Sequence, residues 1–245
     1  MSSHVLESPK DRDACAAQLA HCLTQARSLR LSAANEPVRA SRRQRVREFQ
    51  AARLADTHAD LLADPQFSNA ARFFLTDLYS PRDLSARDAE IARVLPIMTG
   101  VLPLSGLQAL LLAAEVDALS ERFDGAMIDV LGNRLDAPLS RADYAEAYRQ
   151  VGDRAGRTHQ IDLIRATGDL LSTLAHKPGL GTLLKTMRRP AQLAGLGELQ
   201  AFLERGFDAF RSMRRADEFL NRVIDRERAL AAALFAGDAA LAPSD

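Results

Sequence analysis

Apolar residues recur at every third or fourth position along nearly the whole chain, and no segment alternates apolar and polar residues as a β-strand does. Spacing of three and four places the apolar side chains on one face of a helix. The sequence therefore predicts an all-α fold, a multi-helix bundle of about seven to nine helices, in one domain over residues 1–245. We expect residues 1–8 and 238–245 to be flexible tails.

Turn and capping signals divide this pattern into helices. Ser8, Pro9 and Asp11 follow the order of an N-cap, a first-turn proline and a capping-box acid, so we expect a helix from there to about Leu29. A second helix is expected over residues 37–63, because the apolar spacing continues until an Asp-Pro pair ends it.

The stretch 72–88 carries the strongest local signals of the chain. Phe73 and Phe74 belong to an aromatic-rich helix end, and a turn then leads to Ser85, which is followed by Asp88 at the third helical position. A serine followed by an acid at this spacing is typical of a capping box. We expect a fixed helical corner that anchors the core, with Ser85 as the N-cap of its second helix.

Pro103 is expected to begin the central buried helix. Residues 110–114 are all apolar, and a helix that is apolar on every side is typical of a buried position. The pattern extends to Leu131. Residues 132–138 are the clearest break in the chain, and a subdivision of the domain would fall there.

Three further helical segments are expected beyond this break. Ser140 shows the same helix-start signal as Ser85, and helical spacing continues to His176; a short helix then ends at Pro190. Residues 198–235 contain no proline and only one glycine, and they keep the apolar spacing over 38 residues. They predict one long C-terminal helix with a periodicity close to that of a coiled coil.

Charge and composition exclude several classes of protein. The 32 basic and 32 acidic residues give a net charge of zero, so no overall field attracts the chain to nucleic acid or to an anionic membrane. No run of about 18 apolar residues is present, and the first residues lack the pattern of a signal peptide. Cys15 and Cys22 lie two helical turns apart, too far for a disulfide. We therefore expect a soluble, cytoplasmic protein with no membrane contact.

No motif in the chain indicates catalysis or a cofactor. The five histidines are scattered, and no Glu-x-x-His pair of the kind that binds metal in helical bundles is present. The sequence also contains neither a Gly-x-Ser-x-Gly nucleophile elbow nor a phosphate-binding loop. These observations favour a non-enzymatic protein with no metal and no cofactor.

Glu115 is the most suggestive lone carboxylate, since it lies in the helix expected to be buried. A buried acid needs a partner or a shifted pKa. We expect a structural ion pair with Arg87, Arg93 or Arg157 that fixes helix register; a ligand pocket is the alternative. The residues that would form this pocket or polar network are Tyr79, Asp83, Arg87, Asp88 and Glu115.

Charged residues on two predicted helices form a candidate interaction surface. Acids flank the basic part and no aromatic residues suited to base stacking interleave it, so a solvated or salt-bridged face is favoured over nucleic-acid binding. In the C-terminal helix, Asp217 and Glu227 interrupt the apolar stripe and would select register against a partner helix. The basic residues are Arg39, Arg42, Arg43, Arg45 and Arg47.

The motif Phe73-Phe74-Leu75-Thr76-Asp77-Leu78-Tyr79 is followed by Arg87-Asp88 and by Arg93-Val94-Leu95-Pro96. Further distinctive stretches are residues 115–120, 148–152 and 194–207. From about residue 50 onward, the chain resembles an uncharacterised family of proteobacterial all-helical proteins, a domain of unknown function. The resemblance implies a helical fold unit and assigns no site residues.

The sequence leaves three hypotheses on function. The leading one is a non-enzymatic helical protein that acts through protein contacts, in the simplest form self-association through the C-terminal helix. The second is a small-molecule-binding or enzymatic bundle with a pocket near Tyr79 and Glu115. The third and weakest is nucleic-acid binding through the helix that carries Arg39 to Arg47.

Overall fold

Helices account for all the regular structure of the described residues. The computed structural model describes residues 11–75, 90, 93–94 and 103–238. This part of the chain has no strand, and eight of its α-helices have seven or more residues, which confirms the predicted all-α fold. The elements are α1 (Arg12–Ala34), α2 (Pro37–Thr57), α3 (Ala59–Ala63), α4 (Ser68–Phe73), α6 (Leu104–Leu131), the 3-10 helix η2 (Gly132–Asp136), α7 (Arg141–Val151), α8 (Arg154–Ala175), α9 (Leu180–Leu193), α10 (Gly197–Arg211) and α11 (Ala216–Ala236).

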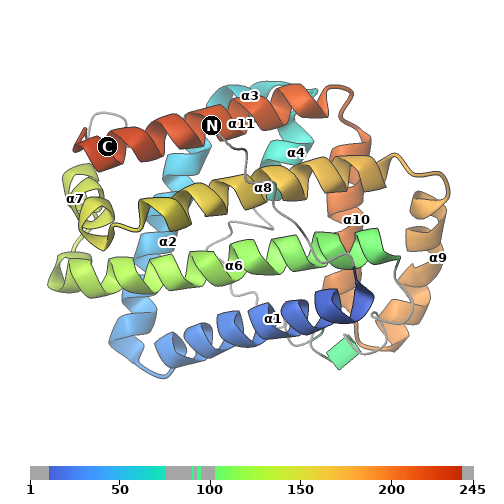
Figure 1. Ribbon diagram of the computed structural model, residues 1–245, viewed down its shortest axis with the longest axis horizontal. Coiled ribbons are helices and arrows are strands. Elements are labelled where there is room, and N and C mark those ends of the chain that lie inside the picture. Colours follow the sequence, from blue (N-terminus) through green and yellow to red (C-terminus); the bar gives the residue numbers. More distant parts are fainter. Residues whose placement is uncertain (1–10, 76–89, 91–92, 95–102, 239–245) are drawn as a thin grey trace.

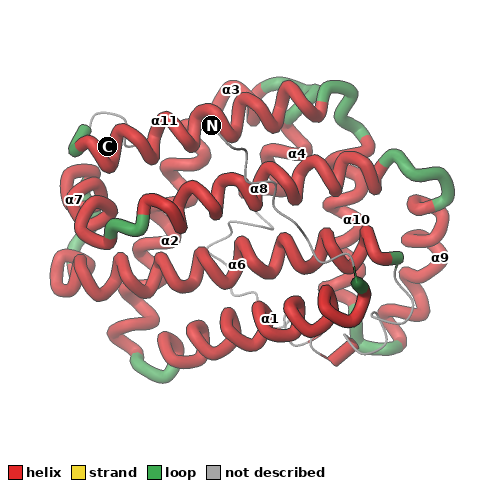
Figure 2. The backbone as a smooth tube through the Cα atoms, in the orientation of Figure 1, coloured by secondary structure: helices red, strands yellow, loops and turns green. Residues whose placement is uncertain are grey.

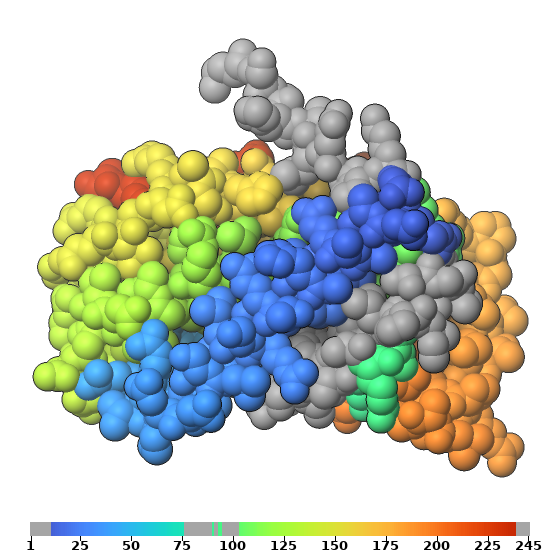
Figure 3. All heavy atoms as spheres, turned by 60° about the horizontal axis from the view of Figure 1, so that its bottom comes forward, coloured from blue at the N-terminus to red at the C-terminus, as the bar shows by residue number. Residues whose placement is uncertain are grey.

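Four long helices lie side by side in one row. In Figures 1 and 2, α1, α6, α8 and α11 follow one another across the molecule, and α2 and α10 cross behind this row. The longest helix, α6, has 28 residues and contacts α1, α8, α7 and α2. Figure 3 shows α1 as an outer helix that runs across one face of the molecule. The arrangement makes α6 the central helix.

The sequence of α6 explains this central position. Leu107 and Leu111 pack against α1, whereas Met127 packs with residues of α7 and α11, so the helix is buried on more than one side. It begins after Pro103 and ends at Gly132, whose φ of 52° lies in the region that favours glycine. The predicted central helix is thus confirmed.

The largest apolar cluster is aromatic and lies where α4, α8, α10 and α11 meet. The Phe74 ring centroid lies 5.7 Å from that of Phe219 and 6.1 Å from that of Phe210. Phe73 is also buried in this cluster. Aromatic pairs at these separations add to the free energy gained by burying their area. Phe73 and Phe74 therefore anchor the core, while the predicted cap at Ser85 lies outside the described residues.

A second apolar cluster joins α2, α6, α7 and α11. It includes residues on both sides of the break at 132–138, so the chain packs across that break. Its larger members are Val46, Met127, Ile128, Leu131, Leu135, Tyr144, Tyr148, Leu230 and Leu234. A third cluster lies between α1 and α6 and contains both cysteines, Cys15 and Cys22, which are free and buried.

The first helix begins and ends later than its sequence signals predict. Its N-cap is Asp11, whose carboxylate accepts a hydrogen bond from the Ala14 amide at 3.1 Å, while the predicted cap Ser8 lies outside the described residues. This bond satisfies an N–H without an intrahelical partner, and the charge of the carboxylate favours the helix N-terminus. The helix continues to Ala34 rather than to Leu29, because its buried face extends along α6.

The helical segment expected after Ser140 forms two helices, α7 and α8. Ser140 is the N-cap of α7, as predicted, and its hydroxyl accepts from the Asp143 amide at 3.1 Å. Gly152 and Asp153 then have φ values of 69° and 50°, which end α7. The Asp153 carboxylate accepts from the Gly156 amide at 2.9 Å and caps α8.

Two smaller predictions of helix ends are also corrected. The helix expected over residues 37–63 is interrupted at His58, which separates α2 from α3. The short helix expected to end at Pro190 continues to Leu193. Proline removes the donor to the carbonyl of Thr186, but Pro190 and Thr186 are both exposed, so water can bind that carbonyl.

The predicted continuous helix over residues 198–235 is wrong. The chain forms α10 and α11, of 15 and 21 residues, with a break at residues 212–215. Met213 lies in this break and is 1% exposed within the aromatic cluster. The break allows α10 to cross α8 while α11 packs along it. No proline or glycine marks the position, so tertiary packing ends α10.

Candidate functional site

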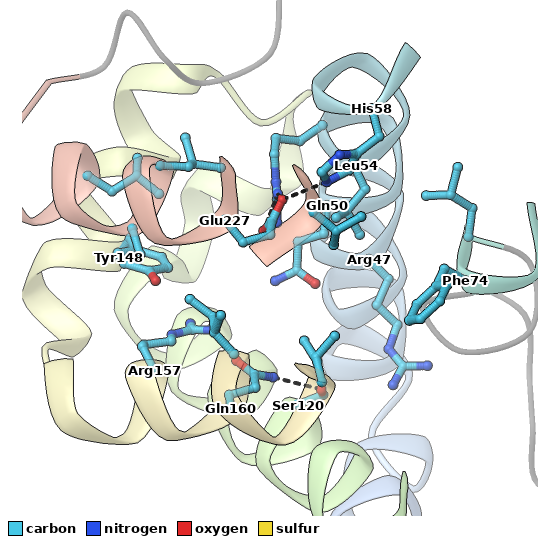
Figure 4. A pocket seen from close by; sticks show the side chains of 18 of the residues that line it. Arg47, Gln50, Leu54, His58, Phe74, Ser120, Tyr148, Arg157, Gln160 and Glu227 are labelled. Carbon is cyan, nitrogen blue, oxygen red and sulfur yellow. Dashed lines mark hydrogen bonds and ion pairs between the residues drawn. The ribbon is translucent and has the colours of Figure 1, made fainter. Parts of the chain in front are cut away.

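A cavity that is partly open to the surface lies between α2, α3, α4, α6, α7, α8 and α11. Its volume is about 120 Å³. Figure 4 shows Glu227 and His58 on one side of this space, and Arg157, Gln160 and Ser120 on the other. These side chains come from four different parts of the chain, so the cavity forms only when the bundle is assembled.

Part of the cavity wall is apolar, where the aromatic cluster borders the space. Pockets that bind small molecules usually combine such a wall with a few convergent polar groups. The larger apolar side chains of the wall are Leu54, Leu61, Phe74, Leu75, Ile161, Ile164, Phe219, Val223, Leu230 and Leu234.

Glu227 is held by two side chains from the end of α2. Arg53 Nη1 donates to Glu227 Oε2 at 2.6 Å, and His58 Nε2 lies 3.1 Å from Glu227 Oε1. The Glu227 side chain is 14% exposed. Burial would raise the pKa of this carboxyl, but Arg53 and His58 outweigh burial and lower the pKa from 4.5 to about 2. The carboxylate is therefore ionised at neutral pH.

We expect Glu227 to make stability depend on pH. Its pKa is lower in the folded than in the unfolded chain, so its contribution is fully present above about pH 4.5 and is lost as the pH falls toward about 2. Urea unfolding of the wild type and of Glu227→Gln between about pH 7 and about pH 2 measures this contribution. The difference in the free energy of unfolding should shrink steadily as the pH falls through this window. A difference that does not change with pH would contradict the assignment.

Arg47 connects the cavity to a buried ionic network on α6. Its Nε donates to Asp124 Oδ2 at 3.2 Å, and its Nη2 donates to Glu121. Glu121 also accepts from Arg30 and Arg43, and its side chain is 2% exposed. Burial would raise the pKa of Glu121, but the three guanidinium groups outweigh it and lower the pKa. Burial prevails at Asp124 and raises the pKa of that carboxyl.

Arg157 lies across the cavity from Glu227. Its guanidinium carbon lies 3.8 Å from the ring centroid of Phe123 and 4.6 Å from that of Tyr148, and its Nη1 donates a long hydrogen bond of 3.4 Å to Gln160 Oε1. The residue is 8% exposed, and its Nη2 has no hydrogen-bond partner. No carboxylate of the described residues forms an ion pair with it.

Neutral hydrogen-bonding groups surround Arg157. Gln160 Nε2 donates to Ser120 Oγ at 2.9 Å, and Ser120 Oγ donates to the Val116 carbonyl at 2.7 Å. Burial raises the pKa of the Tyr148 hydroxyl to about 12, so this hydroxyl is uncharged at neutral pH. Among the described residues, Arg157 thus donates its hydrogen bond to a neutral group, while the carboxylates of Asp124 and Asp153 lie near enough for its charge to lower their pKa values in part.

The cavity is not the pocket that was predicted near Glu115. Glu115 is half-buried between α1 and α6, where Gln18 Nε2 donates to its Oε1 at 2.6 Å, and burial raises its pKa. Arg93 instead donates to the Gly195 carbonyl. Arg157 packs against α6 about two turns further along, so neither pairs with Glu115. The other residues of the predicted pocket lie outside the described residues: Tyr79, Asp83, Arg87 and Asp88.

The basic patch of α2 faces α6 and the helix η2 that follows it. This arrangement agrees with the salt-bridged interpretation, although the acids come from another helix. The guanidinium groups are thereby engaged within the fold. The partners are Asp129 for Arg39, Asp136 for Arg42, Glu121 for Arg43, the Leu135 carbonyl for Arg45, and Glu121 with Asp124 for Arg47.

The two acids of the C-terminal region lie on different faces. Asp217 is exposed in the first turn of α11. Glu227 instead points into the bundle toward Arg53 and His58. Glu227 is thus engaged with its own chain, because the break before α11 turns this helix onto α8 and α7.

The polar lining residues could have been found from one signal in the sequence. Arg157 and Gln160 share the helix face of the buried Ile161 and Ile164, so polar residues interrupt an inward apolar stripe. A buried polar group needs a partner, and several such groups on neighbouring helices indicate a shared polar interior. Periodicity alone does not show that these faces meet His58 and Glu227.

Neither a metal site nor a membrane-spanning helix is found in the described part of the chain. Within it, no group of three or more histidine, cysteine, aspartate or glutamate side chains is arranged to hold a metal ion. Each helix described here is too short or too polar to cross a lipid bilayer.

Fold and site together define an all-α bundle with a cavity lined by charged and apolar side chains. The family model described as Domain of unknown function (DUF8198) matches residues 29–241. The chain therefore belongs to this family, as the resemblance to an uncharacterised helical family implied. No curated protein and no solved structure matches the chain.

Proposed function

We propose that this protein binds a small organic molecule in the cavity. The observation that carries the proposal is a pair of buried polar atoms in the cavity lining, Arg157 Nη2 and His58 Nδ1, that have no hydrogen-bond partner. Buried polar groups are nearly always hydrogen-bonded in folded proteins, and each one left unpaired costs free energy. A bound molecule would supply the missing partner.

The volume and the mixed lining support the same proposal. Packed interiors leave few voids larger than a water molecule. A cavity of about 150 Å³ is large enough to bind benzene, and this one has about 120 Å³. The apolar wall at Phe74 and Phe219 would contact the body of the ligand, and the polar side would orient it.

The apolar periodicity of the C-terminal region had suggested protein contacts through this helix. The packing of α11 gives that alternative less support. Leu220, Ile224, Leu230 and Leu234 of α11 are buried within the same chain. Glu227, expected to select a partner helix, faces Arg53 and His58. The apolar spacing of this helix is accounted for by packing in its own bundle.

The cavity can be filled from the α11 side to test the proposal. Ala231 lines the cavity, whereas the next residue, Ala232, is exposed. We expect Ala231→Phe to block binding while Ala232→Phe, the matched control, leaves it intact. Mass spectrometry of small molecules released by denaturing each purified protein, together with melting temperatures in the presence of a metabolite library, provides the measurement.

The expected result is a compound that is released from, or stabilises, the wild type and the control but not Ala231→Phe. Circular dichroism establishes that each variant is folded, and Ala231→Leu is the smaller replacement should phenylalanine prevent folding. If no compound is released from the wild type and none raises its melting temperature, the proposal is wrong.

A further inference from the structure

We infer that the ligand is a small monocarboxylate with an apolar body, whose carboxylate is bound by Arg157. This inference rests on the proposed function and names the chemical class of its ligand. It depends on the positive charge of Arg157, which has no carboxylate partner among the described residues, and on the apolar wall.

Arg157 is the cation in the lining without a carboxylate partner among the described residues. It is more than nine-tenths buried, and Nη2 is unpaired. Stacking on the rings of Phe123 and Tyr148 fixes the plane of its guanidinium. A planar guanidinium held in this way presents two parallel N–H groups to a carboxylate.

The other guanidinium groups of the lining already face acids. Arg47 donates to Asp124 and Glu121, and Arg53 donates to Glu227. Asp124 is close enough to Arg157 for the cation to lower its pKa in part, but it is engaged by Arg47 and does not form an ion pair with Arg157. The charge that a ligand would neutralise is therefore that of Arg157.

A single negative charge suits this cavity better than a dianion. Glu227 and Asp124 line the same space as Arg157, and both would repel a second negative charge on the ligand. One guanidinium compensates one charge, so a phosphate would remain partly uncompensated away from water. A carboxylate can accept from Arg157 and also from neutral donors such as the Tyr148 hydroxyl.

The remaining wall determines the rest of the ligand. Phe74, Ile161, Ile164 and Phe219 line the same space as Arg157 and offer apolar surface to it. The volume of about 120 Å³ is below the roughly 150 Å³ of a cavity that binds benzene, so it limits the ligand to at most one ring or a short aliphatic chain. Aromatic and short aliphatic monocarboxylates meet both conditions.

Matched pairs of probes test this assignment. Benzoate, phenylacetate and hexanoate each have an amide of the same skeleton: benzamide, phenylacetamide and hexanamide. Isothermal titration calorimetry with the full chain compares the members of each pair, and inorganic phosphate serves as the dianion. We expect at least one carboxylate to bind about tenfold or more tightly than its amide, with phosphate not binding.

Two substitutions at Arg157 separate a binding role from a structural one. Arg157→Met keeps the apolar stem on Phe123 but removes the charge, and Arg157→Lys keeps the charge but not the planar fork. Arg228→Gln removes an exposed arginine that pairs with Asp162 and is the matched control. We expect Arg157→Met to lose carboxylate binding without a lower melting temperature, and Arg157→Lys to retain part of it.

Each outcome supports or overturns the inference. A lower melting temperature for Arg157→Met with unchanged carboxylate affinity in the folded variants would make Arg157 a structural residue. Amides that bind as tightly as carboxylates would overturn the assignment of the ligand class while leaving the cavity a binding site. A further outcome is that none of the probes binds although the wild type retains a compound that Ala231→Phe excludes. That result would overturn the monocarboxylate class and leave the proposed function standing.

Discussion

Replacing Glu121 by glutamine should destabilise the protein by about 3–5 kcal/mol. The carboxylate is buried and accepts hydrogen bonds from Arg30, Arg43 and Arg47. Its amide analogue carries no charge and turns an N–H group toward the guanidinium groups. Arg30 and Arg47 keep Asp117 and Asp124 as partners, whereas Arg43 loses its ion pair with Glu121. Urea unfolding at neutral pH measures the loss as a change in the free energy of unfolding.

Asp129→Asn is the matched control on the same helix. Asp129 pairs with Arg39 at 2.6 Å, but its side chain is 62% exposed. Surface ion pairs contribute about 0–1 kcal/mol, because water solvates both partners when they separate. If Glu121→Gln costs no more than Asp129→Asn, the network on α6 is not the buried ion cluster described here.

Phe74→Ala should cost about 3–5 kcal/mol. The ring is 8% exposed and packs against Phe210 and Phe219 of two other helices. Its removal loses both the buried apolar area and the aromatic contacts, and it enlarges the cavity that the ring borders. Thermal and urea unfolding measure the effect.

Leu193→Ala is the control, because it removes an apolar side chain that is not buried. Leu193 is 85% exposed at the end of α9, and its replacement should change the free energy of unfolding by no more than about 0.5 kcal/mol. Unchanged stability in Phe74→Ala would show that the ring does not pack in the aromatic cluster, and the region from Phe73 onward would then be a candidate recognition surface.

The two largest expected effects come from different parts of the same interior. The aromatic cluster gains free energy from area removed from water, which requires no particular alignment of charges. The network around Glu121 stabilises the fold only when α1, α2 and α6 are in register, because each guanidinium must meet the carboxylate. Arg157 packs on two aromatic rings but forms no ion pair with a carboxylate of the described residues, which is the physical basis for proposing that a ligand neutralises its charge.

The sequence by itself determined the helical class and several helix ends. Periodicity of three and four identifies amphipathic helices whatever they pack against. Pro103, Ser140 and Gly132 affect the backbone within one helical turn. The helix ends that they set can therefore be predicted from the neighbouring sequence alone. The buried helix over 104–131 was also predictable, because its apolar residues occur on every side.

Tertiary structure alone decided where helices stop without a local signal, and which polar residues meet. The break at residues 212–215 contains neither proline nor glycine; Met213 is buried in the aromatic cluster there, and α10 and α11 on either side of it both pack against α8. Glu227, His58 and Arg157 are far apart in the chain, and spacing on one helix says nothing about the helix opposite. The cavity is a property of the assembled bundle, since its walls come from helices that meet only in the fold.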